Sequence, residues 1–226
     1  MKKDVLVDAG VLISLTSGCL DNLLYFFAEK HNIRFIIPPS VEYEVVGRPM
    51  KTKIKRYMFS AMRIQNAIDD GVVAVVDADV KNKTAKIMDS ANHLFYIRGK
   101  PLHLIDLGES EMLALAKELA IEYILIDERT TRMLIEAPIK LKKHLEDEFR
   151  VNVMINKRNL GYLTGEISAF RALRTSELVM LSYESGYFKN FEELQAAVLE
   201  AALYKIKYSG CSIGFGEIKE YLAEVR

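Results

Sequence analysis

Short apolar runs rich in β-branched residues recur along the first two thirds of the chain. They predict buried strands at 5–7, 33–37, 72–76 and 123–126, with a fifth at 151–155. Between these runs, apolar residues at three- and four-residue spacing predict helices over 20–29, 51–69, 84–96 and 109–120. Strands that alternate with helices predict an α/β fold, in which helices cover both faces of a mostly parallel sheet.

The strand signal ends near Lys157, and the remaining residues read as helices separated by breaks that contain glycine. Asn190 with Glu193 resembles a capping box and predicts the start of a helix. The apolar stripe of that helix consists of Phe191, Leu194, Val198, Leu199, Ala202, Leu203 and Ile206. Two interpretations stay open: the stripe packs on the α/β core, or it forms a homodimer interface. We therefore expect an α/β domain at 1–156 and a C-terminal helical extension at 157–226.

The amino-acid composition of the chain excludes several classes of protein. The chain has 226 residues, of which 50% are hydrophobic and 27% charged, which excludes a disordered, collagen-like or disulfide-scaffold protein. Lys and Arg together number 31, as do Asp and Glu, so the formal net charge is zero. Any nucleic-acid partner must therefore be recognised by a local basic patch. Cys19 and Cys211 are too far apart in the sequence to suggest a zinc or redox motif.

The N-terminal segment resembles a lipoprotein-type export signal, with Lys2 and Lys3 before an apolar stretch. Asp4 and Asp8 interrupt that stretch and leave pieces shorter than such a signal needs. No apolar run approaches the roughly 18 residues of a membrane span. We therefore expect a cytoplasmic protein without a membrane partner.

Acidic residues stand where the predicted strands end. Asp8 and Asp127 directly follow their strands, and Glu44 lies shortly after the strand at 33–37. Because ligands gather beyond the carboxyl ends of parallel strands, these positions predict a site. Each acid has an alternative role as a helix cap, since an Asp between strand and helix often accepts backbone N–H bonds.

The predicted helix at 109–120 carries two more acids, Glu109 and Glu111. Asp106 and Glu109 have the spacing of a reciprocal cap, which would employ both side chains. Glu111 is rotated from Glu109 by about 200° around the helix, so only one of the two faces a common site. The prediction assigns that place to Glu111. Clustered carboxylates repel one another, and a bound cation relieves this cost; oxygen-only ligands favour Mg²⁺ or Mn²⁺.

Four segments, in order, resemble the acidic motifs of PIN-domain nucleases, and the resemblance covers about residues 1–156. They are Asp4 to Ile13, Pro38 to Val45, Leu107 to Ala116 and Leu125 to Arg129. The resemblance implies a parallel α/β fold that cleaves RNA with Mg²⁺ or Mn²⁺. It implies that the catalytic and metal-binding residues are Asp8, Glu44, Glu111 and Asp127. The long helical tail resembles that of uncharacterised archaeal-type members more than the compact toxin nucleases.

Two departures from the family pattern bear on activity. Many members place Ser, Thr or Asn after the first Asp, where this chain has Ala9 and Gly10. The third acid is Glu, whereas many relatives have Asp.

The densest basic run follows the Glu44 motif. Its side chains, together with one Arg next to Asp127, are the expected contacts to a nucleic-acid strand: Lys51, Lys53, Lys55, Arg56 and Arg129. Tyr57 or Phe59 would stack an unpaired base. The alternative is that the run is simply the solvated face of a helix.

These observations together predict a Mg²⁺- or Mn²⁺-dependent endoribonuclease that acts on single-stranded RNA. A rival interpretation is a PIN-like module that binds RNA or a protein without cutting. A third is a structural or oligomeric scaffold in which the acids are caps. A homodimer and an antitoxin-like protein remain open as partners.

Overall fold

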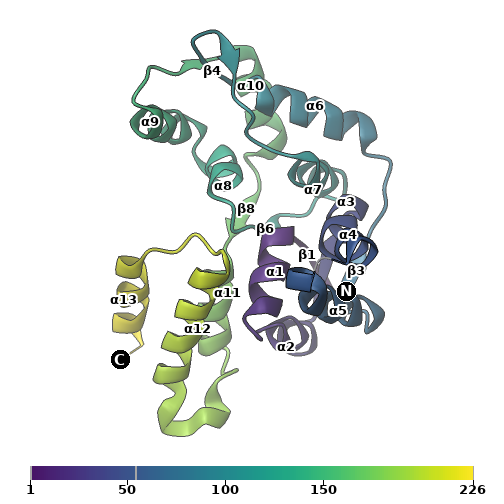
Figure 1. Cartoon of the computed structure of the whole chain (residues 1–226), viewed down its shortest axis with the longest axis vertical. Helices are drawn as coiled ribbons and strands as arrows, with labels where there is room; N and C mark the ends of the chain where they lie inside the picture. Colours follow the sequence, from purple (N-terminus) through teal and green to yellow (C-terminus); the bar gives the residue numbers. More distant parts are fainter. Residues whose placement is uncertain (1, 54, 226) are drawn as a thin grey trace.

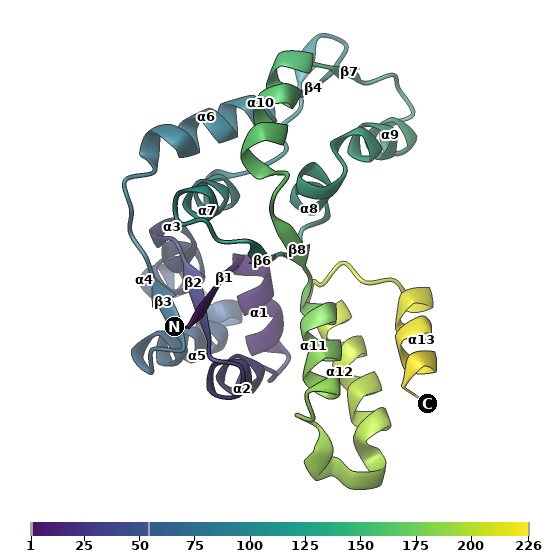
Figure 2. The ribbon, with the colours of Figure 1, turned by 180° about the vertical axis from the view of Figure 1, so that it is seen from behind.

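The structure, a computed structural model, describes residues 2–53 and 55–225. Its centre is a five-stranded sheet with the order β3-β2-β1-β6-β8, in which all neighbouring strands run parallel. The strands are β1 (Lys3–Val7), β2 (Ile33–Ile37), β3 (Val73–Val75), β6 (Tyr123–Leu125) and β8 (Arg171–Leu173). Helices flank the sheet (Figures 1 and 2). The prediction of an α/β fold built on a parallel sheet is confirmed.

The helices before the last sheet strand are α1 (Ala9–Ser17), α2 (Asn22–Lys30), α3 (Pro39–Glu42), the π-helix η1 (Tyr43–Gly47), α4 (Arg48–Thr52), α5 (Lys55–Asp69), α6 (Lys81–Asn92), α7 (Leu107–Glu118), α8 (Arg129–Glu136), α9 (Pro138–Phe149) and α10 (Lys157–Ile167). After it come α11 (Thr175–Glu184), the 3₁₀-helix η2 (Lys189–Leu194), α12 (Gln195–Ser209) and α13 (Phe215–Glu224).

Two hydrophobic cores lie on opposite faces of the sheet. Successive strand residues point to opposite faces, so Val5 and Val7 of β1 enter one core while Leu6 enters the other. The first core includes buried residues of α1, α2, α5, α11 and α12, and the second includes those of α6 to α10. Burial on both faces explains why β1 and β2 read as continuous apolar runs.

A second, three-stranded antiparallel sheet differs from the prediction for this region. Its order is β5-β4-β7, with β4 (Phe95–Ile97), β5 (Lys100–Pro101) and β7 (Met154–Ile155). The predicted strand at 151–155 therefore forms only in its last two residues and lies outside the parallel sheet. The predicted helix at 84–96 ends at Asn92, because the chain turns there into β4.

The parallel sheet continues beyond the expected boundary at residue 156. Strand β8 pairs with β6 and supplies the edge of the sheet, although no strand was expected after 157. Helix α12 packs against α1 and α11, and its buried residues are Leu199, Ala202, Leu203 and Ile206. The interpretation that the stripe packs on the core is thus confirmed for these four residues, whereas Phe191 and Leu194 are exposed.

Two predicted helices begin or continue differently in the structure. The helix expected at 51–69 is divided, because Lys53 adopts a left-handed conformation that ends α4, and α5 begins at Lys55; Ile54 lies outside the described residues. The capping box expected at Asn190 and Glu193 does not start an α-helix: both residues lie in the 3₁₀-helix η2, which is kinked at Glu192, and α12 begins only at Gln195.

Within the described residues, no single helix has the length and apolar character needed to cross a membrane. Helices α1 and α2 reach that length and composition only as a pair, and they meet at a bend of 111°.

Candidate functional site

A cavity with a volume of about 290 Å³ lies where β1 and β6 end. Six of its lining residues carry carboxylates, and they come from four separate parts of the chain. The lining consists of Asp8, Ala9, Gly10, Glu44, Asp106, Gly108, Glu109, Asp127, Glu128 and Gly210. The structure therefore brings together three of the four predicted acids, Asp8, Glu44 and Asp127.

Asp8, Glu44 and Glu109 are the acids of the cavity wall whose pKa is raised, and Asp8 is the most buried of the three. It directly follows β1, its backbone N–H donates to Leu125 O at 2.9 Å, and only 7% of the residue is exposed. Its Oδ2 accepts the Gly10 N–H at 3.1 Å, so Asp8 is also the N-cap of α1. Burial, with the negative charges of Glu109 and Glu44, raises the pKa of Asp8 to about 7 against the opposing Gly10 hydrogen bond.

Glu44 and Glu109 face Asp8 from two different helices. Glu44 is the second residue of η1, and partial desolvation followed by the charge of Asp106 raises its pKa, while Arg48 acts in the opposite direction. Glu109 accepts the backbone N–H of Asp106 at 2.9 Å, which confirms the predicted reciprocal cap. Burial raises the pKa of Glu109 although these hydrogen bonds lower it. The side chain of Glu109 thus both caps the start of α7 and forms part of the cavity wall.

Glu111 is placed differently from the prediction. Its Oε2 accepts the backbone N–H of Ser40 at 3.0 Å, and it does not line the cavity. The rotation of about 200° between Glu109 and Glu111 separates the two, as expected. However, α7 buries Met112 and Leu113 in the core, and this orientation turns Glu109 toward Asp8. Glu111 instead links α7 to the start of α3.

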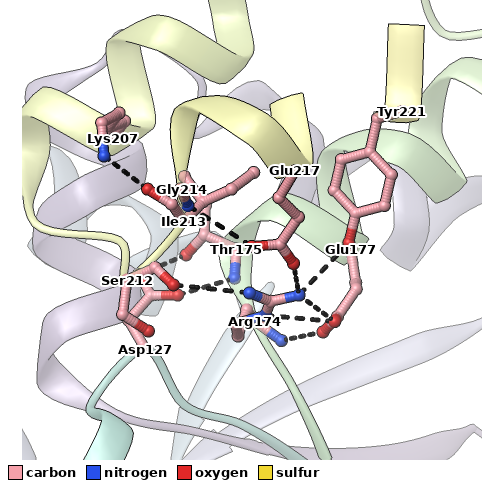
Figure 3. Close-up of polar contacts among 10 residues, drawn as sticks. All are labelled: Asp127, Arg174, Thr175, Glu177, Lys207, Ser212, Ile213, Gly214, Glu217 and Tyr221. Atoms are coloured by element: carbon pink, nitrogen blue, oxygen red, sulfur yellow. Dashed lines mark hydrogen bonds and ion pairs between the residues drawn. The ribbon is translucent and has the colours of Figure 1, made fainter. Parts of the chain in front are cut away.

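Asp127 is held by the C-terminal part of the chain, as Figure 3 shows. Its Oδ1 accepts the Thr175 N–H at 2.8 Å and its Oδ2 accepts the Thr175 hydroxyl at 2.7 Å. Burial, together with the charge of Asp127 and a hydrogen bond to it, raises the pKa of the Cys211 thiol to about 12. Asp127 does not cap α8, because Glu128 does so by accepting the Thr131 N–H. No pattern in the sequence signals the contact with Thr175.

Next to Thr175, the buried Arg174 joins the two C-terminal helices α11 and α13 (Figure 3). Its guanidinium pairs with Glu177 of α11 and Glu217 of α13, and donates to Tyr221 Oη at 3.2 Å. Burial lowers the pKa of Arg174, but the hydrogen bonds to both glutamates outweigh it, so the pKa rises. This cluster fixes α13 beside the residues that hold Asp127.

The predicted substrate contacts lie outside the cavity. Lys51, Lys53, Lys55 and Arg56 are exposed where α4 meets α5, and Arg129 is exposed at the first residue of α8. None of the five lines the carboxylate cavity. The basic run borders Glu44 through Arg48 and Tyr57, which line a neighbouring hollow together with it.

The cavity suits a hard divalent cation in the chemistry of its donors, since its acidic lining offers carboxylate oxygens and neither His nor Cys. Across residues 2–53 and 55–225, no three His, Cys, Asp or Glu side chains form a group that could hold a metal ion by themselves. Mg²⁺ usually keeps several waters and takes only about one or two carboxylates, so a preformed three-ligand cage is not required. The pKa of Asp8 is raised first by burial and then by the charges of Glu109 and Glu44, and a cation in the cavity would offset both effects.

No family model, curated protein or solved structure matches this chain.

Proposed function

We propose that the chain is a Mg²⁺- or Mn²⁺-dependent endoribonuclease of PIN-like fold that hydrolyses phosphodiester bonds of RNA in the cytoplasm. The observation that carries the proposal is Asp8: a buried carboxylate at the end of β1, among five other acids, with a pKa of about 7. Strongly perturbed acids in a cavity are typical of functional sites. A cap alone would not require so many like charges around it.

In this proposal Asp8 and Glu109 would hold the ion directly and Glu44 would act through a bound water, because no three acids of the described residues are grouped closely enough to ligate one ion. Glu109 takes the role that the family resemblance gives to Glu111. Asp127 shapes the wall and adds negative charge. When bound, the ion supplies an activated water and stabilises the leaving oxygen of a phosphodiester. A cation held there would favour the deprotonated form of Asp8, because its positive charge would offset the burial and the neighbouring acids that raise the pKa of Asp8. Burial of Asp8 keeps its carboxylate fixed and away from bulk water.

Thermal melting and RNA cleavage, measured together, test this function. Mn²⁺ at millimolar concentration should raise the melting temperature of the wild type and start cleavage of a single-stranded RNA. Asp8→Asn should lose both effects. The matched control is Asp4→Asn, in strand β1 just before Asp8, which removes only a partly exposed pair with Arg34. If Mn²⁺ neither stabilises the wild type nor supports cleavage, the proposed site is refuted.

One observation favours the rival function, an RNA-binding module without nuclease activity. Both oxygens of Asp127 are already occupied by Thr175, so the fourth acid is engaged in holding α11. Such a module would bind single-stranded RNA equally well with EDTA or Mn²⁺ and leave it intact. Cleavage by the wild type that disappears in Asp8→Asn would exclude this alternative.

A further inference from the structure

A second hollow adjoins the carboxylate cavity and shares Glu44 with it. It has a volume of about 200 Å³ and lies between α1, η1, α4 and α5. Its lining residues are Ile13, Glu44, Val45, Arg48, Pro49, Tyr57 and Ser60. Because one glutamate borders both spaces, a chain that crosses the carboxylates passes this hollow, which we call the base pocket.

The walls of the base pocket combine an aromatic ring with aliphatic side chains. Tyr57 is partly buried, whereas Phe59, two residues further along α5, is 61% exposed and is not part of the lining. The remaining apolar wall comes mainly from Val45 and Pro49, which are buried. An aromatic ring beside aliphatic groups suits a flat heteroaromatic group, which stacks on the ring face.

Charge around the base pocket changes from negative to positive. Glu44 stands on the side of the cavity, and Arg48 lines the pocket without an ion pair to any residue that the structure describes. The Arg56 guanidinium lies 5.3 Å from the centre of the Tyr57 ring. Cations next to a stacking ring favour a phosphate attached to the stacked group, while the acidic cavity repels phosphate unless a cation is present.

We infer that the base pocket binds one unpaired nucleobase of an RNA strand, with a neighbouring phosphate at Arg48. This inference rests on the proposed function and adds to it the place where one base of the single-stranded RNA is held. A base within a duplex is stacked between its neighbours and cannot offer a face to Tyr57. Tyr57, rather than the exposed Phe59, is the stacking residue.

Binding of a fluorescently labelled, single-stranded oligoribonucleotide in EDTA tests the inference without the cation. Tyr57→Ala should weaken binding about tenfold, since one stacked base is lost, and Tyr57→Phe should keep wild-type affinity. Phe59→Ala is the matched control and should bind as the wild type does. An oligoribonucleotide with one abasic position among otherwise unchanged phosphates should bind wild type more weakly. Melting curves verify that every variant is folded.

The same measurements separate this inference from the nuclease proposal. Equal affinity of Tyr57→Ala and Phe59→Ala for the oligoribonucleotide overturns the base pocket, even if the wild type cuts RNA with Mn²⁺. A tenfold loss confined to Tyr57→Ala supports it, even if no cleavage is seen. Asp8→Asn should lose cleavage and retain binding in EDTA, because Asp8 does not line the base pocket.

Discussion

Replacement of Asp8 by Asn should make the cation-free protein more stable at neutral pH. Asn is about as good an N-cap as Asp, so the bond from Gly10 to the cap side chain is retained. The substitution removes only the ionisable group, which is buried among Glu44, Glu109 and Asp127. A loss of charge that stabilises the protein distinguishes a buried acid surrounded by like charges from an ordinary solvated helix cap.

The size of the effect follows from the pKa of Asp8, which rises from 3.8 to about 7 on folding. Because the folded state holds this proton more tightly, the stabilisation is complete below about pH 4 and is lost as the pH rises toward about 7. Each pH unit within this window costs about 1.4 kcal/mol of unfolding free energy. From about pH 5 to about pH 8, Asp8 therefore removes about 3 kcal/mol from the stability of the wild type.

Urea unfolding of both proteins in EDTA, at several pH values, measures this contribution. The difference between Asp8→Asn and wild type should be small near pH 5 and should grow by about 3 kcal/mol toward pH 8. Titration of the other acids occurs in both proteins and largely cancels in the difference. Parallel pH profiles for the two proteins would refute the argument. Mn²⁺ should stabilise only the wild type and thereby reduce the difference.

Three further results are expected from neighbouring residues. Thr175→Val should lower the unfolding free energy by about 2 kcal/mol, because buried Asp127 loses a hydroxyl donor. Thr175→Ser keeps the hydroxyl and should retain wild-type stability, whereas equal urea midpoints for Thr175→Val and wild type would contradict the prediction. Arg174→Leu should lower the unfolding free energy, measured in urea, by about 2 to 3 kcal/mol. This is less than the loss of a fully buried ion pair would cost, because the side chains of both glutamate partners are 31% exposed. An unchanged urea midpoint would show that Arg174 does not hold α13 in place. Glu109→Gln should abolish Mn²⁺-dependent cleavage while Glu111→Gln retains it, and the reverse would restore the assignment by family resemblance.

The central strands were predictable because burial on both faces leaves a direct trace in the sequence. β2 has the predicted bounds, and β1 differs only by two residues at its start. β8 was missed since its three residues include Arg171 and Ala172, and a short edge strand lacks a continuous apolar run. Its position depends on pairing with β6, which no local pattern reveals.

The location of the candidate site was predictable from the sequence, but not every residue that lines it. Asp8, Glu44 and Asp127 follow from the rule that parallel strands end at one edge. The choice between Glu109 and Glu111 depends on how α7 rotates, and that is set by packing over the whole helix. Thr175 is 48 residues from Asp127, so its two hydrogen bonds could be found only in three dimensions.

The contact between Thr175 and Asp127 also affects the order in which the protein becomes complete during synthesis. β1 and β2 leave the ribosome early, yet Asp127 obtains its donors only after Thr175 has been made, and Gly210 joins the cavity wall later still. A nascent chain that stops before Thr175 contains all six acids of the cavity but not the donors that hold Asp127. The acidic cavity is therefore a property of the finished chain, and an unfinished chain is left with an acid whose two hydrogen-bond donors do not yet exist.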